Sequence, residues 1–284
     1  MIQPAHSITP DPSKPMLELR DVSHVYVNDQ GVSLAVEGLN AAIQRGEFVS
    51  LIGPSGCGKT TILSMLAGLF PPSRGEVLVD GNPLAGPTAK IGYMLQQDYL
   101  FPWRTIQENA LTGLEIMGQK TPAAVSRAAQ LLEEMGLGGM ASRYPHELSG
   151  GMRQRVALVR TLAPAPEVLL LDEPFSALDM HIKLQLEDLV QETLQRLGKT
   201  AVLVTHDLGE AAAMSDRIFL LGRRPGRIRY VFDVPPELRA LAPTAARRHP
   251  RYQQLFDTLW EHLDSEVIEQ TAEEAERSRE GEAE

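Results

Sequence analysis

The fold of this chain is decided by one stretch of sequence, Phe48-Val49-Ser50-Leu51-Ile52-Gly53-Pro54-Ser55-Gly56-Cys57-Gly58-Lys59-Thr60-Thr61. Residues 53 to 60 satisfy the pattern G-x-x-x-x-G-K-[ST], and the apolar residues 48 to 52 before them predict a buried strand. Apolar side chains recur at helical spacing over residues 61 to 69. The pattern therefore predicts a glycine-rich loop that leads from a strand into a helix, whose free N–H groups and dipole attract phosphate.

This loop offers separate groups to a nucleotide triphosphate and to its metal ion. Its glycines let the backbone wrap around phosphate oxygens without a Cβ in the way, and Lys59 brings a positive charge to the β- and γ-phosphates. Thr60 places its hydroxyl on Mg²⁺. The residues expected to bind the nucleotide here are Gly53, Pro54, Ser55, Gly56, Cys57, Gly58, Lys59, Thr60 and Thr61. The alternative is a glycine-rich turn that binds nothing.

Two adjacent carboxylates, Asp172 and Glu173, follow the apolar run Val168-Leu169-Leu170-Leu171. A buried strand that ends in such a pair presents one carboxylate to a metal ion and leaves the other free to act as a base. We expect Asp172 to hold the Mg²⁺ through water, because Mg²⁺ keeps several of its waters and takes few protein ligands. Glu173 is then left to polarise the attacking water. On its own, the pair could also be a strand end that meets solvent.

A second helix start of the anion-binding kind lies at Leu148-Ser149-Gly150-Gly151, before a helix expected from residue 152 to 163. One triphosphate does not need two such starts from one subunit. At this point the chain resembles the ATP-binding subunit of ABC transporters. The resemblance implies that ATP lies on the phosphate loop of one subunit and is covered by Ser149, Gly150 and Gly151 of a second copy.

Further residues match the motifs of this family in the same order, over about residues 16 to 230. The resemblance implies that Tyr26 lies under the adenine ring, that Gln96 senses Mg²⁺ and the attacking water, and that His206 contacts the γ-phosphate. Asp179, in Ser176-Ala177-Leu178-Asp179, matches the D-loop of the family. The implied catalytic residues are Glu173, His206 and Gln96, and the implied metal ligands are Thr60, Gln96 and Asp172. From the residues alone, Tyr26 could also be a strand aromatic and His206 a histidine at a strand end.

The composition agrees with a peripheral subunit at the cytoplasmic face of the cell membrane. No apolar run approaches about 18 residues, and the single cysteine, Cys57, excludes an intrachain disulfide. Residues 1 to 15 lack the charged start and the apolar core of a secretory signal. A net charge of −10 argues against a surface for nucleic acid or anionic lipid. If the protein serves a transporter, the membrane part is then a separate chain.

The periodicity predicts an α/β fold of the P-loop NTPase kind, with a parallel sheet covered by helices on both faces. Strands at 168 to 171, 201 to 204 and 217 to 221 alternate with helices at 152 to 163 and 180 to 197, and 17 to 27 and 33 to 43 predict an antiparallel β subdomain. The expected domains are a flexible N-terminus at 1 to 15, an ATPase domain at 16 to 230 with a helical subdomain at about 97 to 150, a helical extension at 231 to 264, and an acidic tail at 265 to 284, disordered or a frayed helix.

The segment after Gln96 indicates the kind of transporter. Residues 96 to 106 resemble the importer branch that serves nitrate, sulfonates, taurine and pyrimidine precursors, and Arg224-Pro225-Gly226-Arg227-Ile228 fits the same branch. The resemblance implies three partners: a transmembrane permease, a second copy of the chain and, indirectly, a substrate-binding protein. The alternative is a soluble ABC ATPase of the repair or translation type, which would carry a long coiled-coil insertion or a second cassette.

Two aromatic residues, Phe101 and Trp103, flank Pro102 in this segment. An exposed apolar patch at this position suggests a docking groove for a permease helix, because a soluble monomer gains little from exposed apolar surface. The alternative is that Trp103 folds inward as part of the core, as large aromatic residues commonly do.

Overall fold

The central sheet of the computed structural model has six strands in the order β10-β9-β3-β8-β7-β6. The structure describes residues 14 to 28, 31 to 176, 178 to 223 and 225 to 281, with the side chains of the last helix up to Glu266. The strands are β3 (Phe48–Ile52), β6 (Ile91–Met94), β7 (Val168–Asp172), β8 (Thr200–Val204), β9 (Arg217–Leu221) and β10 (Ile228–Asp233). All neighbours pair in parallel except β10, which lies antiparallel to β9 at one edge. The predicted parallel sheet is confirmed, with one antiparallel strand added.

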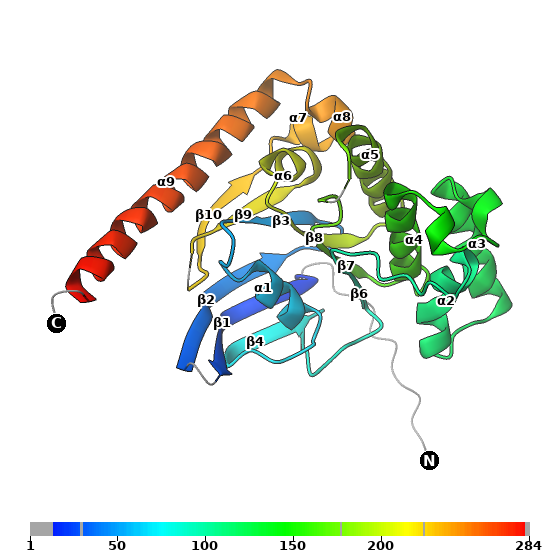
Figure 1. Cartoon of the computed structure of the whole chain (residues 1–284), viewed down its shortest axis with the longest axis horizontal. Coiled ribbons are helices and arrows are strands. Elements are labelled where there is room, and N and C mark those ends of the chain that lie inside the picture. Colours follow the sequence, from blue (N-terminus) through cyan, green and yellow to red (C-terminus); the bar gives the residue numbers. More distant parts are fainter. Residues whose placement is uncertain (1–13, 29–30, 177, 224, 282–284) are drawn as a thin grey trace, which may run out of the picture.

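A second, antiparallel sheet precedes and follows the phosphate loop in the chain. It contains β1 (Leu17–Asn28), β2 (Gly31–Ile43), β4 (Arg74–Val79) and β5 (Asn82–Pro83), in the order β2-β1-β4-β5. Figure 1 shows this sheet below the central one, with α1 (Lys59–Leu66) between the two. The antiparallel β subdomain that we predicted is therefore present.

The remaining helices lie on the two faces of the central sheet and in a lobe beyond it. They are α2 (Ile106–Ile116), α3 (Pro122–Glu134), α4 (Gly150–Leu162), α5 (Met180–Arg196), α6 (Leu208–Met214), α7 (Pro236–Arg239), α8 (Pro243–Ala246) and α9 (Pro250–Gly281), with 3₁₀ turns η1 (Gly138–Met140) and η2 (Pro145–Glu147). Local signals start several of them: the Thr105 hydroxyl and the Glu108 side chain form a capping box on α2, and Thr121 caps α3 just before Pro122.

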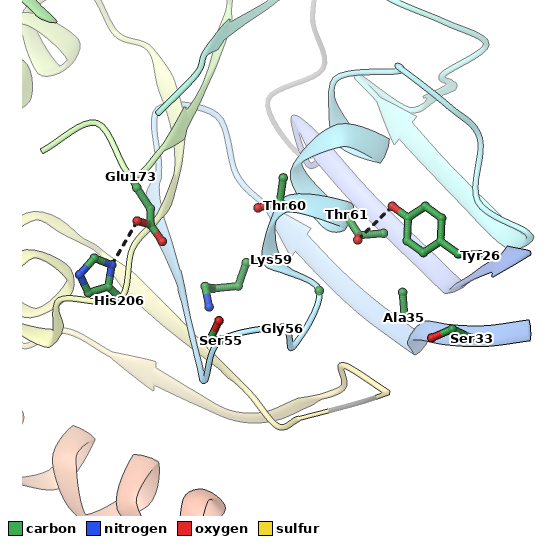
Figure 2. A pocket seen from close by; sticks show the side chains of 11 residues that line it. Tyr26, Ser33, Ala35, Ser55, Gly56, Lys59, Thr60, Thr61, Glu173 and His206 are labelled. Carbon is green, nitrogen blue, oxygen red and sulfur yellow. Dashed lines mark hydrogen bonds and ion pairs between the residues drawn. The ribbon is translucent and has the colours of Figure 1, made fainter. Parts of the chain in front are cut away.

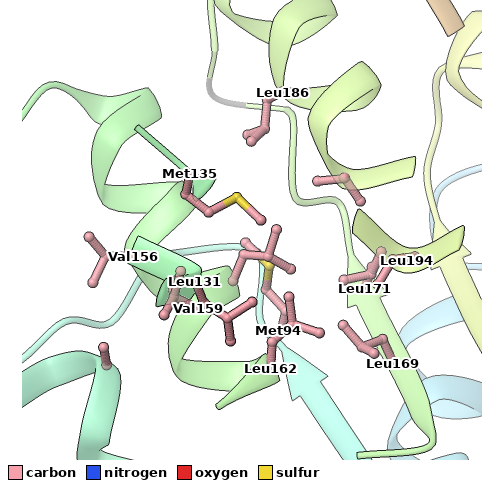
Figure 3. Close-up of a cluster of buried hydrophobic side chains, with 14 of the residues drawn as sticks. Met94, Leu131, Met135, Val156, Val159, Leu162, Leu169, Leu171, Leu186 and Leu194 are labelled. Carbon is pink, nitrogen blue, oxygen red and sulfur yellow. The ribbon is translucent and has the colours of Figure 1, made fainter. Parts of the chain in front are cut away.

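The central sheet is buried on both faces because its strands alternate their side chains between two cores. On β7, Leu169 and Leu171 belong to the core under α3, α4 and α5, which Figure 3 shows converging with Met94 of β6. Val168 and Leu170 belong to the opposite core, around α1 and the antiparallel sheet. This burial fixes the carboxyl end of β7, and with it Asp172, relative to the phosphate loop.

The C-terminal end of the chain differs from our expectation. We expected a helical extension at residues 231 to 264 and a tail from 265 that is disordered or a frayed helix, but α9 begins at Pro250 and continues without a break to Gly281, so residues 265 to 281 are helical. Their abundant Glu, Ala, Gln and Arg are good helix formers, a propensity that we underrated against their low hydrophobicity. Strand β10 also crosses the boundary expected at residue 230. The expected N-terminal segment lies outside the described residues up to position 13. Among the described helices, none is long and apolar enough to cross a membrane.

Candidate active site

The phosphate loop connects β3 to α1 through two positions that accept only glycine. Gly53 has φ +152°, and a Cβ there would lie 2.6 Å from the Leu221 carbonyl oxygen; Gly58 has φ +93°, and its Cβ would lie 2.5 Å from Val36 Cγ1. Both the backbone conformation and the space therefore exclude larger residues. Gly58 is also the N-cap of α1, so the loop delivers the helix N-terminus directly to the site.

Lys59 folds back over the loop and is buried. Its Nζ donates hydrogen bonds to the carbonyl oxygens of Gly53, at 2.8 Å, and Pro54, at 3.0 Å. Cys57 lies beneath it, wholly buried, and burial raises the pKa of its thiol even though Lys59 opposes the shift. The cysteine is therefore a small, neutral core side chain of the loop rather than a reactive thiolate.

A cavity of about 580 Å³ opens over this loop. Figure 2 shows Lys59 and Ser55 at its centre, Tyr26 at one end, and Glu173 with His206 at the other. The lining residues are Tyr26, Ser33, Ala35, Ser55, Gly56, Gly58, Lys59, Thr60, Thr61, Glu173 and His206. Ser33 and Ala35 on β2 were not predicted, since no local pattern distinguishes them from other strand residues. The volume is in the range of small-molecule sites.

Tyr26 closes the end of the cavity nearest to β1. Its hydroxyl lies 3.2 Å from Thr61 Oγ1, and 43% of the residue is exposed. The ring of His24 packs edge-on against it, with the ring centroids 4.8 Å apart. An exposed aromatic ring that is held on one side and hydrogen-bonded at its tip offers a platform for a flat ring of a ligand.

At the opposite end, Glu173 contacts both other residues that we predicted to be catalytic. Its Oε2 lies 3.2 Å from His206 Nδ1 and accepts a hydrogen bond of 3.2 Å from Gln96 Nε2. The Glu173 backbone has φ 45°, a strained conformation held by a hydrogen bond from its N–H to the Val204 carbonyl at 2.9 Å. The chain thus turns sharply at this residue and presents the carboxylate to the cavity.

Asp172 lies one residue earlier, at the buried end of β7. Its Oδ2 accepts a hydrogen bond of 3.2 Å from the Tyr93 hydroxyl on β6. Burial raises the pKa of Asp172, and so does the neighbouring Glu173, while Tyr93 and Lys59 oppose the shift. Burial also raises the pKa of the Tyr93 hydroxyl to about 12, with a further contribution from the charge of Asp172. Asp172 and Gln96 do not line the cavity themselves. Tyr93 was missed by the sequence analysis, because its partner is 79 residues away.

The Ser149 region is formed but lies outside this cavity. The Ser149 hydroxyl accepts a hydrogen bond from the Met152 N–H at 3.4 Å and caps α4, while Ser149 and Gly150 are exposed. Gly151 is buried, and a Cβ there would lie 2.4 Å from Ile182 Cγ2 on α5. Asp179 caps α5 through the Ile182 N–H, and Ala177 of the same motif lies outside the described residues. The structure therefore does not bring Ser149, Gly150, Gly151 or Asp179 to the cavity of their own chain.

Helix α4 nevertheless holds the segment that carries Gln96. The Gln154 Nε2 donates a hydrogen bond of 3.1 Å to the Gln96 carbonyl oxygen, and the Arg153 guanidinium lies 2.9 Å from Asp98 Oδ2. Gln154 is buried. It had not been predicted, because a glutamine inside a helix gives no local signal of a contact with a distant loop.

Comparisons with known proteins agree on one family. The family model described as ABC transporter matches residues 36–176. The ABC transporter ATP-binding protein YtlC of Bacillus subtilis is 53% identical over 88% of this chain and 96% of its own length. The nitrate import ATP-binding protein NrtD of Synechocystis is 41% identical over 75% of this chain and 80% of its own, and the taurine import ATP-binding protein TauB of Escherichia coli is 42% identical over 73% and 81%.

The solved structures give the same result. A dimeric structure of the ATP-binding cassette MJ0796 bound to ADP and Pi has a TM-score of 0.68 and 31% sequence identity, and covers 78% of this chain and 99% of its own. The chain therefore belongs to the ABC transporter ATP-binding family and is an ATPase. The predicted fold class and the predicted family are confirmed.

Proposed function

We propose that this chain hydrolyses ATP at the Glu173 end of the cavity and that the hydrolysis drives import through a separate permease. The observation that carries the chemistry is the contact of the Glu173 carboxylate with both His206 and Gln96 at the rim of a phosphate-binding loop. A carboxylate in that place orients and polarises a water molecule that attacks the γ-phosphate. His206 then donates to the γ-phosphate, and Gln96 keeps Glu173 aligned.

The other residues of the cavity hold the nucleotide. Tyr26 stacks on the adenine ring, and the N–H groups of the loop surround the phosphates. Lys59 exchanges its two carbonyl partners for phosphate oxygens, since a buried ammonium group gains more from an anion than from neutral carbonyls. Thr61 supports the tyrosine through its hydroxyl contact.

Mg²⁺ belongs to the proposal as the cation that accompanies ATP, and the residues present fit it. Burial raises the pKa of the Asp172 carboxylate, so a cation close by would stabilise its charged form. Thr60 adds a hydroxyl at the cavity wall. In the described part of the chain no group of three or more His, Cys, Asp or Glu side chains could hold a metal ion, which fits an ion bound mainly by phosphates and water. When bound, Mg²⁺ would neutralise charge that develops on the phosphates.

Two copies of the chain are proposed to complete two sites between them. The exposed Ser149 and Gly150 at the start of α4, and Asp179 at the start of α5, offer helix N-termini that the cavity of their own chain does not use. The relative of known structure that binds ADP and Pi is itself a dimer. In this arrangement Ser149 and its glycines cover the γ-phosphate held by the other copy.

A mixing experiment tests the shared site. Lys59→Ala should weaken ATP binding, because it removes a charge that faces the phosphates. Ser149→Arg should leave ATP binding by the monomer intact and block the dimer. In a mixture of the two variants, one site carries both lesions and the other carries neither, so hydrolysis should return. Equal inactivity at every mixing ratio would contradict the shared site.

The proposed permease contact is an apolar groove beside the Gln96 segment. A cavity of about 360 Å³ lies between β6, the segment after Gln96 and the ends of α2 and α4, with Leu95, Tyr99, Phe101, Ile116 and Met117 among its lining. Trp103 is 72% exposed and packs against Phe101, so the alternative of a core tryptophan is wrong. A permease helix in this groove would sit next to Gln96, at the cytoplasmic face of the membrane. The matching relatives include nitrate and taurine import proteins, which supports import as the direction.

A further inference from the structure

The C-terminal helices are joined to α5 by buried polar contacts rather than by apolar packing alone. Arg247, which caps α8, lies 2.5 Å from Glu187 on α5, and Glu187 is completely buried. In the next position of α5, Asp188 accepts hydrogen bonds from the Thr244 N–H at 2.8 Å and the Thr244 hydroxyl at 2.7 Å. Figure 1 shows α8 between α5 and α6 at the end of the sheet. The C-terminal extension is thus held to α5 by contacts with two acidic side chains of that helix.

One turn before Glu187, Lys183 ties α5 to the segment that carries His206. Its Nζ lies 2.6 Å from Asp207 Oδ2 and 2.5 Å from Glu210 Oε1, and its side chain is only 12% exposed. Both acidic partners follow His206 in the chain. Lys183 is therefore the cation that balances two carboxylates directly behind the histidine.

The two neighbours of His206 are fixed by hydrogen bonds. Asp207 Oδ1 accepts from the Gly209 N–H at 2.7 Å and the Glu210 N–H at 3.2 Å, which caps α6. The Asp207 N–H donates to Thr205 Oγ1 at 3.0 Å, and the Thr205 hydroxyl donates to Glu210. The backbone that aims His206 at Glu173 consequently depends on Asp207 staying in place (Figure 2).

Lys183 and Glu187 stand four residues apart on the same helix and are neighbours on its surface. Arg247 neutralises Glu187, so Lys183 remains with Asp207 and Glu210. Without Arg247, a buried Glu187 carboxylate would have Lys183 as its nearest alternative cation. Lys183 would then leave Asp207, and the segment around His206 would loosen.

We infer that Lys183 and Arg247 are positioning residues for His206, with Arg247 keeping Lys183 on the His206 segment and making the C-terminal extension part of the catalytic apparatus. This inference rests on the proposed role of His206 at the γ-phosphate. The titratable and charged groups around Glu187 are Lys183 on α5, Glu210 on α6, Arg247 at α8 and Tyr252 on α9. Tyr252 adds a second contact of the extension, a hydrogen bond of 3.4 Å from its hydroxyl to the Gly209 carbonyl oxygen.

The test compares substitutions in the full-length chain by steady-state ATPase assay at pH 8.5, far below each melting temperature. Arg247→Met should lower kcat about tenfold with little change in the KM for ATP, in the range of couplings carried by packed networks. Adding Glu187→Gln to it should restore most of kcat, because Lys183 is no longer drawn away. Lys183→Met should lower kcat as well, but Glu187→Gln should not restore it. Arg248→Met, at the exposed neighbouring arginine, is the matched control.

The pH profile supplies a readout that simple packing would not move. The defect of Arg247→Met should deepen as pH rises from 7 to 9, because more of Glu187 becomes ionised, and Glu187→Gln should abolish that dependence. Equal kcat in the single and the double variant, or a defect independent of pH, would overturn the inference. His206→Ala distinguishes failure of the proposed function from failure of this inference. If His206→Ala leaves kcat unchanged, the proposed function is wrong. If His206→Ala is inactive and Arg247→Met is fully active, only the positioning role is rejected.

Discussion

The phosphate loop and the start of α4 differ in how completely one chain builds a binding site around them. Around the phosphate loop, the cavity, Lys59, Glu173 and His206 are assembled by one chain, from strands whose ends meet at one edge of a buried sheet. At the start of α4, Ser149 caps the helix, but Ser149 and Gly150 are exposed and lie outside the cavity over the phosphate loop. Trp103 and the groove beside Phe101 are likewise open at the surface.

This difference indicates which parts of the molecule act within the chain and which act on partners. The assembled end owes its geometry to burial and to hydrogen bonds within the chain, so substitutions there should act in an isolated subunit. The exposed surfaces have local geometry but no counterpart, so substitutions there should act only when a second copy or a permease is present. The predictions below test that division.

The largest effect is expected at the assembled end, from Glu173→Gln. Loss of a general base or water-orienting carboxylate lowers the rate about 10²- to 10⁴-fold, while ATP affinity should stay near wild type because the phosphate loop is untouched. Steady-state ATPase and nucleotide titration measure the two quantities. Glu76→Gln, at a surface carboxylate paired with Arg20, is the control. Turnover within threefold of wild type would reject the role of Glu173.

A smaller effect is expected on stability, from Glu187, the buried carboxyl group of α5 that contacts the C-terminal extension. Burial raises the pKa of Glu187 to about 7, with Arg247 opposing the shift. A carboxyl group whose pKa is higher in the folded than in the unfolded state binds protons more tightly when folded, so its contribution to stability is present at low pH and is lost as pH rises from about 4.5 to 7. Relative to Glu187→Gln, the wild type should therefore lose up to about 3 kcal/mol of unfolding free energy between pH 5 and 8.

Urea unfolding of the wild type and of Glu187→Gln at several pH values measures this difference in unfolding free energy. Glu192→Gln, at an exposed position of the same helix, provides the control. A difference between wild type and Glu187→Gln that stays constant with pH would mean that burial does not raise the pKa of Glu187 in the folded protein.

The smallest effect on the isolated subunit is expected at the exposed surfaces. Trp103→Ala should leave the melting temperature nearly unchanged, since the side chain is 72% exposed. It should weaken capture of the permease about 30-fold, equivalent to about 2 kcal/mol at an interface hot spot. Trp260→Ala is the matched control, because Trp260 is also exposed but lies on α9. A loss of about 3–5 kcal/mol in stability, typical of a core aromatic, would contradict a role of Trp103 that is confined to the permease contact.

Much of the fold and of the site could be predicted because the signals are local in the sequence. The glycines and Lys59 of the phosphate loop, the apolar run before Asp172 and the serine cap at Ser149 each specify their own backbone conformation within a few residues. The continuous apolar run of β7 likewise predicted a buried strand, as in a parallel sheet covered on both faces. The continuation of α9 to Gly281 was left open between disorder and a frayed helix, because low hydrophobicity was weighted above helix propensity.

By itself, then, the sequence determined the class of fold, the order of the motifs and the residue types offered to a nucleotide. The tertiary structure alone decided which of them meet: Tyr93 with Asp172, Gln154 with the Gln96 carbonyl, and Arg247 with Glu187. These pairs join residues about 60 to 80 positions apart on different elements. Their contact depends on how whole helices and strands pack, so no periodicity or spacing within one segment can reveal it.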